Sequence, residues 1–185
     1  MQFYLRTQPF IHFLNGDKAT FSDYMVWRSD WVYHGESPSG TFFASARDLA
    51  LLGSIMAGKG ERHGMKLMSK ETWEQFHSEP ITKVDVAQPV PGLSPNTFTK
   101  GGVSFYDHPD IYSDKNNSVA RWIREQRQGF YGWNGMGGSV FMWEPELDIG
   151  FAYVPTLMAW HDLHGMRGLK LQEQVKKCVR NIRIK

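Results

Sequence analysis

The sequence contains a single cysteine, Cys178, among its 185 residues. One cysteine excludes an internal disulfide and a cysteine-rich zinc site, and it is compatible with a reducing compartment. No apolar run approaches the roughly 20 residues that a membrane-spanning helix requires. The N-terminal residues lack the basic region and the long apolar region of a secretory signal. We therefore expect no membrane span, and the sequence assigns no compartment.

The sequence also lacks an excess of charge of either sign. Lysine and arginine number 21 against 19 acidic residues, which gives a net charge of +2, and the two signs are interspersed. A nucleic-acid-binding surface would show a clustered basic stripe, so we expect no nucleic-acid partner. The basic residues between Lys170 and Lys185 are explained by a solvated helix face with cations near the helix C-terminus.

Familiar catalytic motifs are missing as well. No serine is followed three residues later by lysine, and the sequence has no Gly-x-Ser-x-Gly. Ser39 and Ser139 are flanked by glycine but have no base beside them, which favours ordinary turn and strand serines. His161 and His164 lie three residues apart without an evident third ligand, so we interpret them as surface residues. The sequence predicts no metal site and no cofactor.

The residues that are present suit one domain, or a large part of one, because 41% are apolar and 14% aromatic. Residues 1–34 form an irregular lead-in with several helix and strand breakers. Ser45 opens a helix through a capping box and Gly58 ends it. Ser69 caps a second helix that includes Phe76. Residues 80–98 carry four prolines and are expected to be mostly loop.

The C-terminal half favours antiparallel strands followed by a helix. Residues 102–106 read as a strand, and the polar residues 107–128 as an excursion or loop. Residues 139–143 and 149–154 should pair as a hairpin. A helix from about Leu169 should pack on this hairpin through apolar residues at helical spacing, namely Leu171, Val175, Cys178 and Ile182. The expected class is α+β, an antiparallel sheet with flanking helices.

Glycine is concentrated just before that hairpin. Gly132, Gly135, Gly137 and Gly138 fall within seven residues, directly around Trp133. Such density allows a backbone to approach another backbone or a ligand closely. A strand edge of this kind could offer an N–H group to an oxyanion. Close packing explains the same glycines, and it is the favoured interpretation of the local pattern.

Three segments occur in an order that resembles a known family. They are SPSGTFFASARDLALLGSIMAGKG (residues 37–60), GMKLMSKETWEQF (residues 64–76) and YGWNGMGGSVFMWEPELDIGFAYVPTLM (residues 131–158). Together they resemble the C-terminal half of the serine β-lactamase-related family, which comprises class C β-lactamases, penicillin-binding relatives and esterases. The resemblance covers roughly residues 35–183. It implies a five-stranded antiparallel sheet between helices and acyl transfer from an amide or ester to serine.

The resemblance also implies a site. Trp133, Asn134 and Gly135 take the place of the family's Lys-Thr-Gly or His-x-Gly triplet, and Met136 would then provide an oxyanion backbone N–H. Tryptophan departs from the family here, because it offers only one indole N–H donor. The letters of Ser94-Pro95-Asn96 match a second family element but fall in the wrong place, so we reject them.

The family's nucleophilic Ser-x-x-Lys has no counterpart in these residues. We therefore expect residues 1–185 to be a single partial domain, the C-terminal portion of such a hydrolase, and to be inactive as an isolated chain. A small amide or ester would be the substrate of the full-length parent. The alternative is a non-catalytic interaction or structural module. We also expect the isolated chain to self-associate through an unpaired sheet edge.

Overall fold

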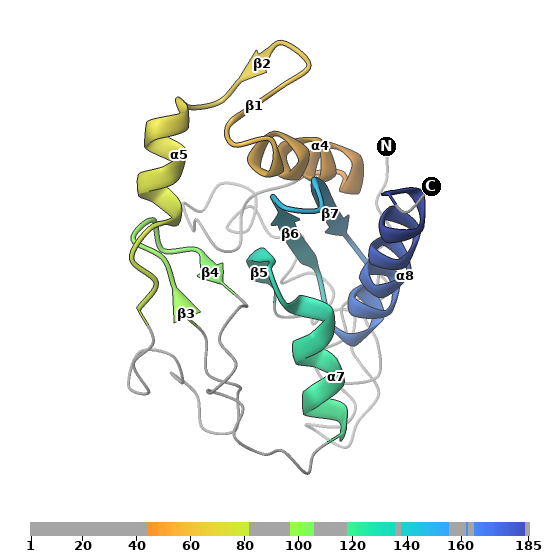
Figure 1. The fold of residues 1–185 in the computed structure, drawn as a ribbon. Helices are drawn as coiled ribbons and strands as arrows, with labels where there is room; N and C mark the ends of the chain where they lie inside the picture. The colour runs from red at the N-terminus through yellow and green to blue at the C-terminus, as the bar shows by residue number, and fades with distance from the viewer. Residues whose placement is uncertain are drawn as a thin grey trace, which may run out of the picture.

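The computed structural model describes residues 44–81, 97–105, 118–135, 138–155, 162 and 165–183. These residues form an α+β fold, as the sequence predicts (Figure 1). The elements are α4 (Ala46–Ala57), β1 (Glu61–Arg62), β2 (Met65–Lys66), α5 (Lys70–His77), β3 (Thr97–Phe98), β4 (Ser104–Phe105), α7 (Ser118–Arg127), β5 (Tyr131–Asn134), β6 (Val140–Glu144), β7 (Ile149–Tyr153) and α8 (Met166–Arg183).

A five-stranded antiparallel sheet organises the fold. Its order is β3-β4-β5-β6-β7, so each strand pairs with its neighbour in the sequence. The predicted hairpin is confirmed as β6 and β7, with Val140 opposite Tyr153 and Glu144 opposite Ile149. The predicted strand at residues 102–106 is observed as the shorter β4. The expected loop at residues 80–98 ends in β3, and residues 82–96 lie outside the described part of the chain.

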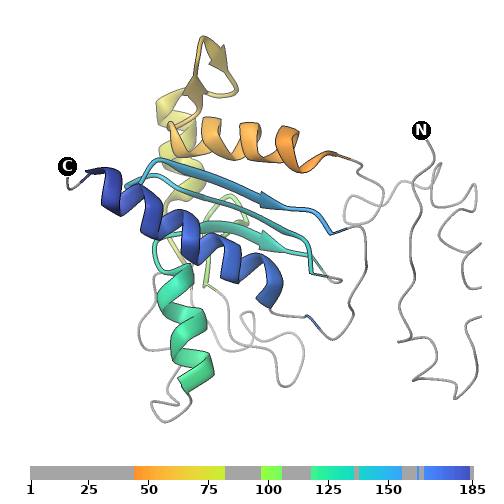
Figure 2. The ribbon, with the colours of Figure 1, turned by 90° about the vertical axis from the view of Figure 1, so that its right-hand side faces the viewer.

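Helices cover the two faces of this sheet (Figure 2). Because side chains alternate along a strand, β6 directs Phe141 and Trp143 to one face and Val140 and Met142 to the other. The first pair joins an apolar cluster with residues of α4 and α5. The second pair joins a cluster that Val175 and Val179 of α8 also contact. The described residues thus form two cores, one on each side of the sheet.

On the α4 side, the backbone of α4 lies very close to the backbone of β7. A Cβ atom on Gly150 of β7 would overlap the backbone of Gly53 and Ser54 in α4, and a Cβ on Gly53 would lie 3.2 Å from the Cα of Gly150. Two facing glycines therefore let the helix lie directly on the strand. The predicted cap at Ser45 is confirmed, because its side chain accepts a hydrogen bond from the Asp48 backbone N–H, and its hydroxyl donates to the Asp48 carboxylate.

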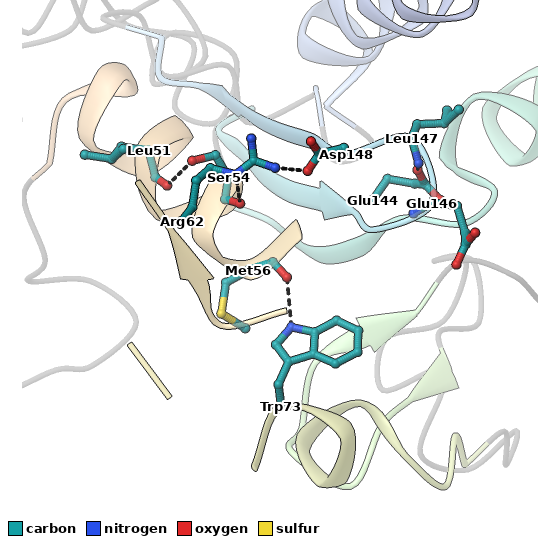
Figure 3. A network of polar contacts seen from close by, with 9 residues as sticks. All are labelled: Leu51, Ser54, Met56, Arg62, Trp73, Glu144, Glu146, Leu147 and Asp148. Atoms are coloured by element: carbon teal, nitrogen blue, oxygen red, sulfur yellow. Dashed lines mark hydrogen bonds and ion pairs between the residues drawn. The ribbon is translucent and has the colours of Figure 1, made fainter. Parts of the chain in front are cut away.

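The C-terminal end of α4 is held by two other side chains (Figure 3). The Trp73 indole Nε1 donates to the Met56 carbonyl at 2.8 Å, and Arg62 Nε donates to the Ser54 carbonyl at 2.9 Å. Arg62 also forms an ion pair with Asp148 in the turn between β6 and β7. The same two carbonyls also accept backbone N–H groups at the end of the helix, so the side-chain contacts add to these bonds and tie α4, α5 and the β6–β7 turn together.

The predicted inner face of the C-terminal helix is wrong in three of its four residues. Leu171 is 51% exposed, Ile182 is 73% exposed and Cys178 is also exposed, whereas Val175 does pack on the core. The helix begins three residues earlier than expected, at Met166. Its buried face carries Leu169, Gln172 and Lys176. Apolar spacing identified the helix correctly, but it did not decide which of two neighbouring stripes faces the sheet.

The predicted loop at residues 107–128 is also wrong in its second half, where α7 forms. Its inner face contains the buried Ile123 and the buried Arg127, with Trp122 partly buried. Of these three side chains only Trp122 and Ile123 are apolar. The segment is otherwise polar, so its composition did not indicate a helix. Residues 106–117 lie outside the described part of the chain, as does the lead-in at residues 1–34.

Candidate functional site

The candidate site lies at the end of strand β5, where the sequence places the family-like triplet. Trp133 is 50% exposed and sits opposite Phe141 of β6. Its ring lies 5.8 Å from the ring of Phe98, measured between centroids, with a tilt of 33°. The result is a partly open aromatic surface made by β5 and the segment that contains β3. An indole at this position can stack on a ligand or donate one hydrogen bond, but it cannot transfer a proton as lysine or histidine would.

Asn134 faces the other side of the sheet. With its amide oxygen turned toward Arg127, it accepts from the two terminal guanidinium nitrogens at 3.1 and 2.6 Å. Arg127 is the last residue of α7 and is only 4% exposed. Charge-assisted hydrogen bonds of this kind fix position, so Asn134 connects β5 to α7.

Gly135 closes the turn between β5 and β6. Its N–H donates to the Ser139 carbonyl at 2.8 Å, and its carbonyl accepts from the Gly138 N–H at 3.1 Å. The Gly135 amide is therefore already used within the hairpin. Met136, the candidate oxyanion donor, lies outside the described residues, as does Gly137.

Among the described glycines of this cluster, Gly132 is required by packing against backbone, whereas Gly135 and Gly138 lie against the ends of side chains. A Cβ on Gly132 would overlap the Phe141 carbonyl, and a Cβ on Gly135 would overlap the Ser139 hydroxyl. A Cβ on Gly138 would lie 2.7 Å from a terminal nitrogen of Arg167. These contacts agree with the packing interpretation favoured by the sequence for Gly132, Gly135 and Gly138.

Beside Gly138, the carboxylate of Asp162 caps the start of α8. Asp162 is buried, and its carboxylate accepts from the backbone N–H groups of Met166 and Arg167 and from Arg167 Nε at 3.0 Å. Burial acts to raise the pKa of Asp162, but these hydrogen bonds and the Arg167 charge outweigh it and hold the pKa below its usual value. The Asp162 side chain therefore fills the place at which a helix N-terminus could bind an external anion.

Sequence reasoning missed two buried charged residues on the α8 side of the sheet, Lys176 and Glu144. Lys176 is 4% exposed, and its ammonium donates to the carbonyls of Glu125 and Gln126 at 2.8 and 3.0 Å. Glu144 is buried at the end of β6 and accepts from the backbone N–H groups of Glu146 and Leu147. Burial raises the pKa of Glu144 and lowers the pKa of Lys176. Lys176 caps the C-terminal end of α7, which fixes that helix against α8.

A second missed group is His77, at the last residue of α5. The sequence showed it only as one of seven scattered histidines. It is 7% exposed and lies between α5 and the sheet, with the Trp73 ring stacked on it at a centroid distance of 3.8 Å. Its helical spacing from Trp73 was the one signal in the sequence that could have placed it on the inner face of α5.

The described serine hydroxyls with defined partners serve local structure. Ser45 and Ser69 cap α4 and α5, while Ser54 and Ser78 donate to carbonyls three residues before them. Ser104 is fully buried opposite Gly132. Ser39, His161, His164 and the rejected Ser94-Pro95-Asn96 all lie outside the described residues.

Two further properties hold for the described part of the chain. It contains no group of three histidine, cysteine, aspartate or glutamate side chains placed to bind a metal ion. None of its helices combines the length and the apolar character that crossing a membrane would require.

Fold and site together define an α+β protein in which an antiparallel sheet lies between helices and carries, at the end of its central strand β5, an aromatic and glycine-rich segment. No known family profile matches the chain, and no curated protein matches it. A solved structure described as a novel penicillin-binding protein homologue from Caulobacter crescentus is similar, with 20% identity over 68% of this chain and a TM-score of 0.48. The chain spans 30% of the length of that structure.

Proposed function

We propose that this chain is the C-terminal portion of a serine β-lactamase-like hydrolase. In the full-length parent, the reaction would be acyl transfer from a small amide or ester to serine, followed by hydrolysis. These 185 residues would supply the antiparallel sheet that carries the candidate site, together with its supporting helices. They would not supply the nucleophile and its base.

The observation that carries the proposal is the packing of α4 on the β6–β7 hairpin. The first and third family-like segments meet there, because Gly53 comes from one and Gly150 from the other. The second segment joins them through the hydrogen bond from Trp73 to the Met56 carbonyl. Three motifs that are far apart in the sequence thus contact one another, as parts of one scaffold would.

Two features favour an isolated chain without hydrolase activity. The first is Trp133, which stands where the resemblance implies lysine or histidine, and the second is the absence of a nucleophile with its base. An activated nucleophile needs a base within hydrogen-bond reach, and no Ser-x-x-Lys is encoded. We expect no turnover of a chromogenic cephalosporin or a nitrophenyl ester by the purified chain. Turnover that one serine substitution abolishes would overturn this expectation.

The hydrolase proposal itself is tested on the natural gene product that contains these residues. A fluorescent penicillin and a fluorophosphonate probe are added, and any labelled residue is identified by mass spectrometry. Labelling of a serine in a Ser-x-x-Lys sequence supports the proposal. If neither probe labels the product, in the natural form or as Trp133→Lys, the hydrolase assignment is wrong.

The half-exposed Trp133 specifically favours a second candidate, a non-catalytic interaction module on the same scaffold. An exposed tryptophan beside Phe98 suits stacking and contact better than proton transfer. In that case Trp133→Ala should abolish binding of a partner without changing the fold, as judged by circular dichroism. A labelled catalytic serine would argue against this alternative.

A further inference from the structure

His77 occupies a closed aromatic site between α5 and the sheet. The Trp73 ring stacks on it, while Phe76, Tyr131 and Trp143 present their rings at centroid distances of 5.2, 4.6 and 5.8 Å. These residues come from α5, β5 and β6. The imidazole is therefore the point at which α5 is joined to the two strands that carry the candidate site and its hairpin.

The partners of His77 determine where its proton lies. Nδ1 is 2.7 Å from the Trp73 carbonyl, which can only accept, so Nδ1 carries the hydrogen. Nε2 is 2.9 Å from the Trp143 indole Nε1, which can only donate, so Nε2 must accept. One hydrogen bond of each kind requires the neutral ring. The neutral form is thus imposed by geometry.

Protonation would disrupt this arrangement at one atom. A proton on Nε2 would direct two N–H groups at each other across the contact with Trp143, so one of the rings would have to move. Stacking on Trp73 tolerates a cation, which places the conflict at Trp143 rather than in the stack. Burial lowers the pKa of His77, and the hydrogen bond to the Trp73 carbonyl offsets this only in part.

Within the described part of the chain, no carboxylate compensates for the charge. The titratable group facing His77 from the strands is the phenol of Tyr131, and the acids of α5, Glu71 and Glu74, are exposed. Glu79, just beyond the helix, pairs with Lys100 instead. Among the described residues, none forms an ion pair with His77 that could stabilise its protonated form.

The end of α5 also holds the β3–β4 edge of the sheet. Gly101 N–H donates to the Phe76 carbonyl at 3.0 Å, and Lys100 N–H donates to the Ser78 carbonyl at 2.9 Å. Ile81 exchanges two backbone hydrogen bonds with Phe98. Since Phe98 contacts Trp133, a movement of this helix end would be transmitted to the aromatic surface of the candidate site.

We propose that His77 is a pH-operated latch. In its neutral form it holds α5 against β5 and β6, and when protonated it releases the end of α5 together with the β3–β4 edge and the Phe98–Trp133 surface. The surface is therefore fully formed at neutral pH and loosened in mildly acidic solution. This regulation does not depend on whether the chain belongs to a hydrolase.

The direction follows from proton linkage. The folded chain binds the His77 proton less readily than the unfolded chain, so the contribution to stability is present above about pH 6.5 and is lost as the pH falls below it. Local opening at α5 should increase by up to about tenfold per pH unit in this window. Helix α8 packs on the opposite face of the sheet from His77 and serves as an internal reference.

Hydrogen exchange of the whole 185-residue chain, corrected for intrinsic rates, tests the proposal at about pH 7.5 and about pH 5.5, on either side of the ordinary histidine pKa. We expect peptides from residues 70–81 and 97–105 to lose protection at the lower pH while residues 166–183 keep theirs. His77→Gln, which retains an acceptor for Trp143 but does not titrate, should keep its protection at both pH values. Equal loss in His77→Gln, or loss throughout the chain, would overturn the latch.

Two further variants separate the latch from a structural role. His63→Asn replaces an exposed histidine at a left-handed turn position that asparagine tolerates, and it should behave as the parent chain does. Trp143→Phe removes the opposing N–H, so the pKa of His77, followed by NMR, should rise toward its ordinary value. If Trp143→Phe leaves that pKa unchanged, the contact with Trp143 does not operate the latch.

Discussion

The two faces of the sheet are built on different chemistry. On the α4 side, tryptophan and other apolar side chains pack around Trp143, and glycine brings helix and strand into backbone contact. On the α8 side, an apolar cluster around Met142 is bordered by buried polar groups, namely Gln172, Lys176, Glu144 and Arg127. Apart from the protonation of His77, the α4 side should therefore be sensitive mainly to added volume. The α8 side should respond to changes in charge and hydrogen bonding.

The largest effect is expected where α4 touches β7. Gly150→Val would drive side-chain atoms into the backbone of Gly53 and Ser54, which cannot move without displacing α4. We expect a loss of about 3 kcal/mol or more in the free energy of unfolding, measured by urea denaturation. Gly64→Asn is the matched control, since that turn glycine has open space around it and a φ of 76° that asparagine tolerates. Comparable losses in both variants would contradict the close approach.

Two leucines on α8 test which stripe of that helix is inside. Leu169 is 1% exposed and Leu171 is 51% exposed, although the sequence favoured Leu171 as the core residue. Leu169→Ala should cost about 2–4 kcal/mol because it leaves a cavity, whereas Leu171→Ala should change stability by less than about 1 kcal/mol. The reverse order in thermal or chemical denaturation would show that α8 is rotated.

The start of α8 should lose stability when its cap is removed. Asp162→Ala leaves the N–H groups of Met166 and Arg167 without their carboxylate partner, at a cost of about 1–2 kcal/mol near neutral pH. Because the folded pKa of Asp162 is depressed, its contribution is present above the ordinary aspartate value and is lost as pH falls through the folded pKa. The difference between parent and variant should therefore shrink in acid. A difference that stays constant down to about pH 2 would be inconsistent with this cap.

Gln172 offers a substitution that should stabilise the protein. It is fully buried, and its two amide atoms have no hydrogen-bond partner within the described part of the chain. Gln172→Met keeps a similar length and removes the buried amide, so we expect a gain of about 1 kcal/mol. Gln174→Met, at an exposed position of the same helix, is the control and should be nearly neutral. A loss of stability in Gln172→Met would mean that the amide has a partner.

Substitutions on the outer surface of α8 should change stability least. They should nevertheless change self-association measurably. Leu171 and Ile182 are exposed, and among the described strands β7 pairs with β6 alone. Exposed apolar side chains and an open strand edge favour association. We expect light scattering to rise with concentration, and the double variant Leu171→Lys, Ile182→Lys to reduce it. A monomer at all concentrations would contradict the expected self-association.

The sequence was most informative where a rule is local. Ser45 and Ser69 were recognised as helix caps because a hydroxyl followed by its helical partners needs only neighbouring residues to act. The β6–β7 hairpin was recognised because strand periodicity and a turn occur within 16 residues, from residue 139 to residue 154. Helix α7 was missed because its inner face relies on Arg127, whose role depends on Asn134 of a different element.

By itself, the sequence determined the class of fold, the caps, the hairpin and the position of Trp133 beside a glycine cluster. The tertiary structure decided which stripe of α8 is buried, what the glycines contact and which polar groups are enclosed. The reason is physical. Caps and periodicity act between residues a few positions apart, whereas burial of Lys176, His77 or Gln172 depends on partners from other elements. His77 shows this most clearly, because its protonation state is fixed jointly by Trp73 of its own helix and Trp143 of a distant strand.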